Sequence, residues 1–312
     1  MADSGPSGWQ DRKPTLSHRL QYLAYRSLLG ALRVTPESVA LRIGEGLGWF
    51  AGVVLGIRRR VVEEHLGHAF PEKDRTWRRK VLRASFRHLG RESVATFLLG
   101  TMSPQEIIRR TRVEGLEALE EALAEGKGVV LVAGHLGNWE VGGAALAARG
   151  VPMDAVAQKQ RNPLFHADVT RNREKLGMRV ILRGQAPKEV LRSLRRGRVV
   201  GIVADQNAKR SEIFVDFFGR RAATARGAAV FALRTGSPIF VGSVRRLPGA
   251  SARYQVNLLP VEYQGTGDPE EDAHRLTQLH TWFLEREIRR APEQYFWQHR
   301  RWKTRPPEER GG

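Results

Sequence analysis

The chain has 312 residues, and a hydrophobic content of 41% is enough for a globular protein with a substantial core. It has no cysteine, which excludes disulfides, thiolate metal sites and cysteine nucleophiles and favours a reducing compartment. With 52 Lys and Arg against 33 Asp and Glu, the net charge is +19. Such a charge favours an anionic partner, whether nucleic acid, a membrane surface, a phosphorylated substrate or an acidic carrier protein.

The N-terminal part indicates a polar tail and then a membrane-facing extension. Residues 1–15 contain Pro, Gly and Ser and lack the apolar run of a secretory signal peptide, so we expect a disordered tail. The apolar stretch 16–34 follows, interrupted by Arg19, Arg26 and Arg33. It is not a clean spanning helix of about 20 apolar residues, but it suits a helix lying in the membrane interface.

A second apolar stretch, 39–57, is the stronger membrane candidate. Its last part, 46–57, is rich in Gly and Trp and is closed by three arginines at 58–60. This pattern suits a short insertion that its basic end holds on the cytoplasmic side. A buried hairpin of two soluble helices is the alternative. We expect residues 16–60 to associate with the membrane, and the sequence leaves open whether they span it.

The rest of the chain predicts a single α/β domain over 61–303, followed by a polar tail at 304–312. Apolar residues recur at helical spacing from 61 to 108, and short β-rich runs then alternate with helical segments. We expect strands at 128–133, 153–157, 179–182, 199–204, 239–244 and 253–258, and helices at 140–148, 164–176, 187–196, 224–234 and 268–291. This alternation predicts a mainly parallel sheet flanked by helices.

The most informative segment for chemistry is the loop after the first of these strands. His135 follows that strand at its carboxyl end, where open α/β sheets bind their ligands. Gly134 and Gly137 allow the backbone to turn sharply and to approach a substrate, and Asn138 suits the N-cap of the next helix. The loop therefore predicts an active-site histidine.

An acidic residue five positions later strengthens this prediction. Glu140 lies in the first turn of the expected helix, from which its carboxylate can fold back on the imidazole of His135. A carboxylate bonded to one ring nitrogen fixes the tautomer and stabilises the imidazolium when the other nitrogen takes a proton. No Gly-x-Ser-x-Gly elbow is present, which favours direct attack by a bound hydroxyl over a covalent enzyme intermediate.

The segment 134–140 resembles the His-x₄-acid motif of the lysophospholipid acyltransferase superfamily, in the form found in bacterial lipid A biosynthesis lauroyl and myristoyl acyltransferases. The likeness covers most of the chain. Further motifs follow in the family's order: Ala69-Phe70-Pro71, Gln160-Arg161-Asn162-Pro163, Asp205-Gln206, Phe217-Phe218-Gly219-Arg220, Ala223-Thr224 with Gly227, and the segment 297–303.

This resemblance implies an O-acyltransferase that moves a fatty-acyl group from an acyl thioester to a hydroxyl of a membrane glycolipid, foremost a lipid A precursor. The donor would be carried by acyl carrier protein or coenzyme A. The resemblance also implies attachment to the cytoplasmic face of the inner membrane, and neither a metal nor a cofactor beyond the thioester. His135 and Glu140 carry over as the base dyad, and Arg161 as a ligand of the thioester oxyanion or of an acceptor phosphate.

A wider set of residues is implied near the substrates. Asp205 ends a strand and is expected to orient Arg161 or the acceptor, or else to cap a turn. Phe218 and Thr224 are expected to shape the acyl channel or cap a helix. Arg246, by contrast, is expected to be a surface arginine distant from the site. The substrate-binding set is Gly134, Gly137, Asn138, Asn162, Asp205, Gln206, Phe218, Arg220 and Thr224.

Other functions stay open at this point. A basic nucleic-acid-binding protein would explain the charge, although no RNP aromatics, zinc-ligand spacing or basic region with heptads is visible. A nucleotide-binding P-loop is disfavoured, because Gly126-Lys127-Gly128 lacks the Ser or Thr and the upstream glycine. Within the superfamily, another phosphoglycolipid or a lysophospholipid is an alternative acceptor, and the motifs do not encode the acyl chain length.

Overall fold

The structure is a computed structural model that describes residues 14–208 and 212–309. Most of the tail expected at 1–15, and the end of the tail expected at 304–312, lie outside these residues. Within them, Thr15 caps the first helix by accepting a hydrogen bond from the backbone N–H of His18 at 3.2 Å.

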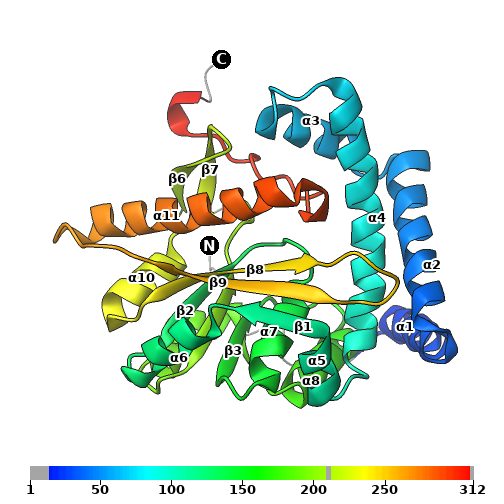
Figure 1. Cartoon of the computed structure of the whole chain (residues 1–312), viewed down its shortest axis with the longest axis horizontal. Coiled ribbons are helices and arrows are strands. Elements are labelled where there is room, and N and C mark those ends of the chain that lie inside the picture. The colour runs from blue at the N-terminus through cyan, green and yellow to red at the C-terminus, as the bar shows by residue number, and fades with distance from the viewer. Residues whose placement is uncertain (1–13, 209–211, 310–312) are drawn as a thin grey trace.

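Helices and strands alternate along the chain (Figure 1). The helices are α1 (Leu16–Val34), α2 (Glu37–Trp49), α3 (Arg59–Ala69), α4 (Arg75–Leu99), α5 (Pro104–Arg110), α6 (Leu116–Ala124), α7 (Trp139–Ala148), α8 (Pro163–Lys175), α9 (Ala186–Leu194), α10 (Gly227–Thr235) and α11 (Pro269–Arg290). A π-helical turn, η2 (Phe50–Val54), follows α2, and 3-10 turns are η3 (Arg183–Gln185), η4 (Pro292–Gln294) and η5 (Pro307–Glu309). The strands are β1 (Thr111–Glu114), β2 (Val129–Ala133), β3 (Met153–Ala157), β4 (Arg179–Leu182), β5 (Val199–Val203), β6 (Glu212–Phe217), β7 (Arg220–Ala225), β8 (Ile239–Arg246) and β9 (Tyr254–Val261).

Seven of these strands form one sheet in the order β1-β9-β8-β2-β5-β3-β4. Every neighbouring pair in it is parallel except the β8–β9 hairpin, which is antiparallel. The predicted α/β class with a mainly parallel sheet is therefore confirmed. In the register of β2 and β5, Ala133 pairs with Val203, so the carboxyl ends of these two strands lie side by side.

Helices cover both faces of the sheet (Figure 1). Along β2, Val129 and Leu131 point to one face and Val130 and Val132 to the other, as strand alternation requires. The first pair packs with α5, α6 and α7, and the second with α9, α10 and α11. Both faces are buried, which explains why β2 reads as an uninterrupted apolar run.

Helix α6 and the strands β1, β6 and β7 were not expected. The short edge strand β1 pairs with β9, and β6 and β7 form a separate antiparallel hairpin. The helix expected at 224–234 begins only at Gly227, because residues 224 and 225 end β7. This hairpin packs with the C-terminal segment, α3 and α4 in a third apolar cluster that includes Phe217, Trp297 and Trp302.

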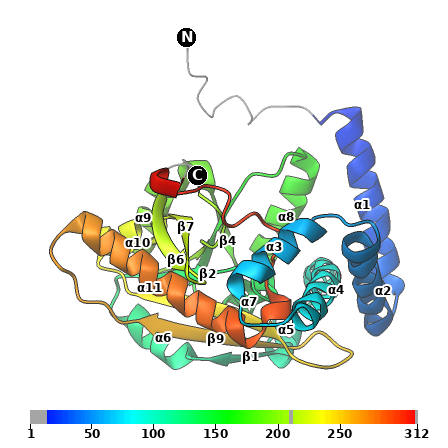
Figure 2. The ribbon, with the colours of Figure 1, turned by 90° about the horizontal axis from the view of Figure 1, so that it is seen from above.

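The N-terminal helices form a layer beside α4, on one side of the sheet (Figures 1 and 2). Glycines four residues apart let α2 and η2 approach α4 closely: a Cβ on Gly48 would lie 2.2 Å from the carbonyl oxygen of Phe86, and one on Gly90 would lie 2.1 Å from that of Gly44. Part of the glycine-rich run expected to enter the membrane therefore packs against the protein. Helix α1 contacts α8 through the rings of Tyr25 and Phe165, whose centroids are 4.8 Å apart.

The outer face of this layer is apolar. Among the described residues, all exposed large apolar side chains except Ile108, Leu247 and Trp282 lie between Leu16 and Ile57. Across residues 14–208 and 212–309, no single helix has both the length and the apolar character needed to cross a bilayer. One bent pair, Glu37–Val54 with Arg59–Ala69 at 87° to each other, meets these criteria jointly.

Candidate active site

His135 lies two residues beyond the end of β2, beside the end of β5. Because β2 and β5 are parallel neighbours in register, Asp205, two residues beyond β5, faces it. The Nδ1 of His135 lies 2.7 Å from Oδ1 of Asp205, and its backbone N–H donates to Oδ2 at 2.8 Å. The loops that follow the neighbouring strands β2 and β5 thus bring a histidine and a carboxylate together at one edge of the sheet.

This pair defines the protonation of the imidazole. Burial lowers the pKa of His135, but the charge and hydrogen bond of Asp205, with a further contribution from the charge of Glu140, raise it above the ordinary value. Burial conversely raises the pKa of Asp205, but the charge and hydrogen bonds of His135, with the charge of Arg301, lower it to about 2. Asp205 is therefore ionised, and in the neutral ring the proton sits on Nδ1.

The other ring nitrogen, Nε2, carries no proton in this tautomer and can therefore accept one. The side-chain Nε2 of Gln206 lies 3.2 Å from Nε2 of His135, the geometry of a donor amide facing a ring acceptor. The ring of Trp139 packs edge-on against the imidazole, with centroids 4.4 Å apart. The site thus presents one basic ring nitrogen with a replaceable partner.

The C-terminal segment completes the loop. The carbonyl of His135 accepts from the backbone N–H of Phe296 at 3.0 Å, and the N–H of Gly137 donates to the carbonyl of Gln294 at 2.9 Å. Gly137 has φ of 61°, and a Cβ there would lie 1.8 Å from the carbonyl oxygen of Val244, so only glycine fits. The sharp turn predicted at this glycine is confirmed, and its approach to a substrate stays a prediction.

Glu140 differs from its expected geometry. Its carboxylate binds both nitrogens of a guanidinium fork, with Arg173 Nε donating to Oε2 at 2.9 Å and Nη2 to Oε1. The expected hydrogen bond from Glu140 to the imidazole was therefore wrong, since Asp205 occupies that position. The reason is that α8 brings a guanidinium to the first turn of α7, and a bidentate pair is stronger than one bond to a ring nitrogen.

The imidazole borders a cavity of about 630 Å³. The cavity runs between the sheet and α7, where Leu131, Leu146, Met153 and Met178 give it apolar walls. The polar side chains that line it include His135, Glu140, Gln206, Arg173 and Arg183. A base in the wall of a largely apolar cavity suits a long apolar substrate group with a reactive polar end.

Comparison with known proteins identifies this arrangement. The model of the family described as bacterial lipid A biosynthesis acyltransferase matches residues 10–304. The chain belongs to this acyltransferase family. It is 31% identical over 273 residues to the lipid A biosynthesis lauroyltransferase of Escherichia coli (strain K12), covering 87% of each chain, and 29% identical to the palmitoleoyltransferase of the same organism over the same length and shares. The predicted family and enzyme class are thus confirmed.

A different acceptor occurs among the relatives. The acyltransferase is 35% identical over 162 residues to the phosphatidylinositol mannoside acyltransferase of Mycobacterium tuberculosis (strain CDC 1551 / Oshkosh), which covers 50% of this chain and 51% of the relative. The names of the relatives thus include more than one kind of glycolipid.

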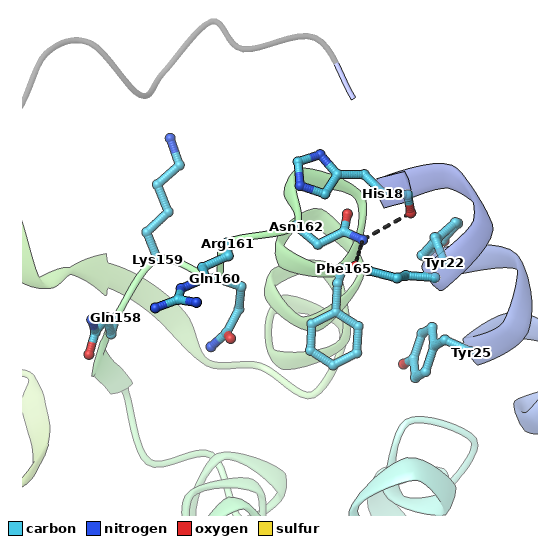
Figure 3. A pocket seen from close by; sticks show the side chains of 10 residues that line it. His18, Tyr22, Tyr25, Gln158, Lys159, Gln160, Arg161, Asn162 and Phe165 are labelled. Carbon is cyan, nitrogen blue, oxygen red and sulfur yellow. Dashed lines mark hydrogen bonds between the residues drawn. The ribbon is translucent and has the colours of Figure 1, made fainter. Parts of the chain in front are cut away.

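Arg161 of the acyltransferase lies outside the cavity of His135. It is exposed and lines a separate hollow between α1 and the start of α8, together with His18, Tyr22 and Phe165 (Figure 3). Asn162 caps α8 and donates to the carbonyl oxygen of His18 at 2.9 Å (Figure 3). Its amide therefore ties α1 to the catalytic domain. The predicted role of Arg161 at the oxyanion stays a prediction.

Asn138 caps α7, as expected, with its side chain accepting from the N–H of Val141 at 3.3 Å. Its amide nitrogen also donates to Oε2 of buried Glu92 at 2.9 Å, and Arg246 donates to the other carboxylate oxygen at 3.2 Å. The expectation that Arg246 is a surface residue was wrong, since only 6% of it is exposed. These bonds make Asn138 and Arg246 part of the support behind the histidine loop.

Other expected residues that do not line this cavity are Gly137, Asn138, Asp205, Phe218, Arg220 and Thr224. Phe218 is buried in the third apolar cluster, and Arg220 lies 2.5 Å from Nε2 of His68. Thr224 is buried and accepts from Arg301. By contrast, Gly134 and Gln206 line the cavity directly.

Sequence reasoning missed the partners supplied by distant elements. Arg173 is one of several arginines on a predicted helix, and nothing in its local pattern marks it as the partner of Glu140. Asp205 was expected at the catalytic edge, but as a residue that orients Arg161 or the acceptor or caps a turn, and its bond to His135 was not predicted. The backbone contacts of Phe296 and Gln294 depend on tertiary structure alone.

Proposed function

We propose that this acyltransferase moves a fatty-acyl group from an acyl thioester to a hydroxyl of a lipid A precursor, with His135 as general base. The observation that carries the proposal is an imidazole that bonds Asp205 through Nδ1 and lines a largely apolar cavity. The lipid A acyltransferases that the chain matches over most of its length support the acceptor.

In the proposed reaction, Nε2 of His135 removes the proton of the acceptor hydroxyl as its oxygen attacks the thioester carbonyl carbon. The tetrahedral intermediate collapses by breaking the carbon–sulfur bond and expelling the thiolate. The imidazolium then returns its proton to the thiolate, so the products are an ester and a free thiol. Asp205 holds the productive tautomer and stabilises the imidazolium, while the pair of Glu140 and Arg173 forms a charged wall of the cavity.

The cavity and the surface of the enzyme also support proposals for the acyl donor and for membrane attachment. The apolar cavity suits the acyl chain, and the surface charge suits an acidic acyl carrier protein or the phosphates of coenzyme A. The exposed apolar residues between Leu16 and Ile57, with the arginines among them, would hold the enzyme on the cytoplasmic face of the inner membrane. The reaction as proposed requires no bound cofactor.

The test is transfer of a radiolabelled acyl group to a purified lipid A precursor by wild type and His135→Ala. The substitution should lower turnover by about 10²- to 10⁴-fold, the usual contribution of a general base. His274→Ala is the matched control, because His274 is exposed on α11 and bonds the carbonyl of Phe214 at 3.0 Å. Near-normal turnover by His135→Ala would exclude this mechanism.

The second candidate acceptor is another phosphoglycolipid. It is favoured by the match to the phosphatidylinositol mannoside acyltransferase over half of this chain. Offering both glycolipids and a lysophospholipid to the same preparation, with kcat/KM compared among them, decides between these acceptors. A higher value for either alternative would replace the lipid A precursor in the proposal.

A further inference from the structure

A second hollow of about 520 Å³ lies next to the catalytic histidine, between η2, α4 and the C-terminal segment. Asn207 lines both this hollow and the cavity of His135. Phe296 lines it too, and the ring of Phe296 is 5.9 Å from the imidazole between centroids. A ligand in this hollow would therefore lie beside the reacting nitrogen.

The hollow is cationic. Arg58, Arg300 and Lys303 line it, all three are exposed, and among the described residues none of them pairs with a carboxylate. By contrast, the adjacent Arg59 pairs with Glu63 at 3.0 Å. No acidic side chain of the described residues lines this hollow. Three unpaired cations so close together favour an anion between them.

A buried polar side chain also lines this hollow. Gln298 lines the hollow with only 6% of its surface exposed, and neither its amide nitrogen nor its amide oxygen has a hydrogen-bond partner among the described residues. A buried amide without partners costs free energy, so such a group indicates a missing ligand or water. In addition, Arg58 has φ of 61°, an unfavourable conformation for a residue other than glycine.

The neighbouring histidine offers another donor. Nε2 of His299 accepts from the backbone N–H of Asn207 at 3.0 Å. Burial is the main reason that the pKa of His299 is lowered, so the ring is neutral at neutral pH and its proton sits on Nδ1. The hollow thus combines two arginines, a lysine, a free amide and a neutral imidazole, which is a donor set for phosphate oxygens.

We propose that this hollow binds the phosphate of the membrane lipid acceptor, and that it places the acceptor hydroxyl next to His135. This inference rests on the proposed function, because it divides the two substrates between two hollows, the acyl chain in the apolar cavity and the phosphate on Arg58, Arg300 and Lys303. The lipid source is favoured by the apolar edge of the hollow. Ile57 and Ala51 line it, and the exposed side chains of Phe50, Val54 and Leu55 lie directly before Ile57 in the chain.

The first test is kinetic and uses the triple variant Arg58→Gln, Arg300→Gln, Lys303→Gln in the full chain. It should raise KM for the phosphorylated glycolipid by about tenfold or more, since each lost charge-assisted contact weakens binding. KM for the acyl thioester and for the dephosphorylated glycolipid should stay unchanged. The control is Arg195→Gln, Arg196→Gln, whose exposed arginines precede β5 at the opposite edge of the sheet.

The second test measures binding without turnover, so that it stands even if no acceptor is acylated. Calorimetric titration of His135→Ala with monomeric dihexanoyl phosphatidic acid should show tighter binding than with dihexanoyl glycerol, and adding the three glutamines should abolish the preference. A preference unchanged by the glutamines would overturn the inference. So would inorganic phosphate binding as tightly as the lipid, or a raised KM for the thioester alone, which would assign the hollow to the donor.

Discussion

At the scale of single residues, two carboxylates act on the imidazole of His135 in different ways. Asp205 bonds the imidazole directly, whereas Glu140 is held by Arg173 and acts on His135 through its charge. The structure thus reverses the predicted order of the two carboxylates, because the sequence assigned Glu140 to the imidazole. The two positions can be distinguished experimentally, because each carboxylate raises the pKa of His135 but only one of them also fixes the tautomer.

We expect Asp205→Asn to move the acidic limb of the kcat/KM profile to lower pH. The base must be neutral to accept a proton, and losing the carboxylate charge lowers the pKa of His135, so the neutral ring persists at lower pH. At high pH, turnover should fall by about 10²- to 10⁴-fold, because the imidazolium loses its charged partner. The measurement is the pH dependence of acyl transfer from pH 5 to pH 9.

Glu140→Gln is the companion variant and should shift the same limb in the same direction, but by less. It keeps the direct bond between His135 and Asp205 and removes only a more distant charge. A larger shift for Glu140→Gln than for Asp205→Asn would restore Glu140 as the principal partner of the imidazole. Both variants should remain folded, as checked by circular dichroism.

Arg246 gives a residue-scale prediction about stability. Its guanidinium and the carboxylate of Glu92 are both buried, and Asn138 and Tyr254 bond the same carboxylate. Arg246→Ala leaves a buried charge without its partner, so the free energy of unfolding should fall by about 3–5 kcal/mol. Urea unfolding measures it, with Arg253→Ala as the control because Arg253 is exposed. Equal effects of the two substitutions would contradict the buried network.

At the scale of elements, the close contact of α2 with α4 is sensitive to one added carbon. Gly48→Ala places a methyl group 2.2 Å from the carbonyl oxygen of Phe86, and neither backbone can yield without separating the helices. Overpacking of this kind should lower the free energy of unfolding by about 1–3 kcal/mol. Thermal and urea unfolding measure the change.

The same helix supplies the control. A Cβ on Gly46 meets no heavy atom within 4 Å, and Gly46 is exposed. Gly46→Ala should therefore stabilise the helix, by up to about 1 kcal/mol, because alanine is the better helix former. Two glycines two positions apart are thus expected to respond with opposite signs. A loss of stability at both positions would mean that helix packing is not the reason for the glycines.

Local sequence patterns predicted most of the fold, for reasons visible in these elements. β2 is an apolar run buried on both faces, and α11 has a regular apolar spacing, so both were expected within one or two residues. The β6–β7 hairpin was missed because its alternation is weak and its first strand is charged. The role of Gly48 was also missed, because a glycine-rich apolar helix has the same pattern in a membrane as against another helix.

The sequence predicted the site residues that lie in one short segment. It did not predict the partners that only tertiary contacts bring to the site. His135, its two glycines and the cap by Asn138 follow from the segment 134–140. The bond of Glu140 to Arg173 joins residues 33 positions apart, and the pair of Arg246 and Glu92 joins residues 154 positions apart. Nothing in either local pattern specifies such a partner.

At the scale of the whole molecule, helices α1 and α2 lie on the far side of α4 from α11 (Figure 2), and they carry most of the exposed large apolar side chains. We expect Leu20→Glu with Leu47→Glu to weaken binding to vesicles containing phosphatidylglycerol by at least about tenfold. Each leucine loses roughly 1.5–3 kcal/mol of apolar burial, and each added carboxylate is repelled by anionic lipid. Vesicle flotation measures the change.

Trp282→Glu is the matched control for that experiment. Trp282 is also an exposed apolar residue, with 49% of its surface accessible against 59% for Leu20 and 62% for Leu47, but it lies on α11, away from the proposed membrane face. It should bind vesicles like wild type at every salt concentration. Equal losses for Trp282→Glu and the double variant would show that binding depends on total charge and not on this surface.

The pairing of residues 294–296 with the loop at 135–137 has a consequence for biosynthesis. The helices expected to meet the membrane are made first, whereas the backbone that holds His135 in place is made roughly 240 residues later. At usual elongation rates of about 5–20 residues per second, this separation corresponds to roughly 12–50 s. With the membrane attachment proposed above, a nascent chain has time to reach the bilayer before the backbone that holds His135 has been made.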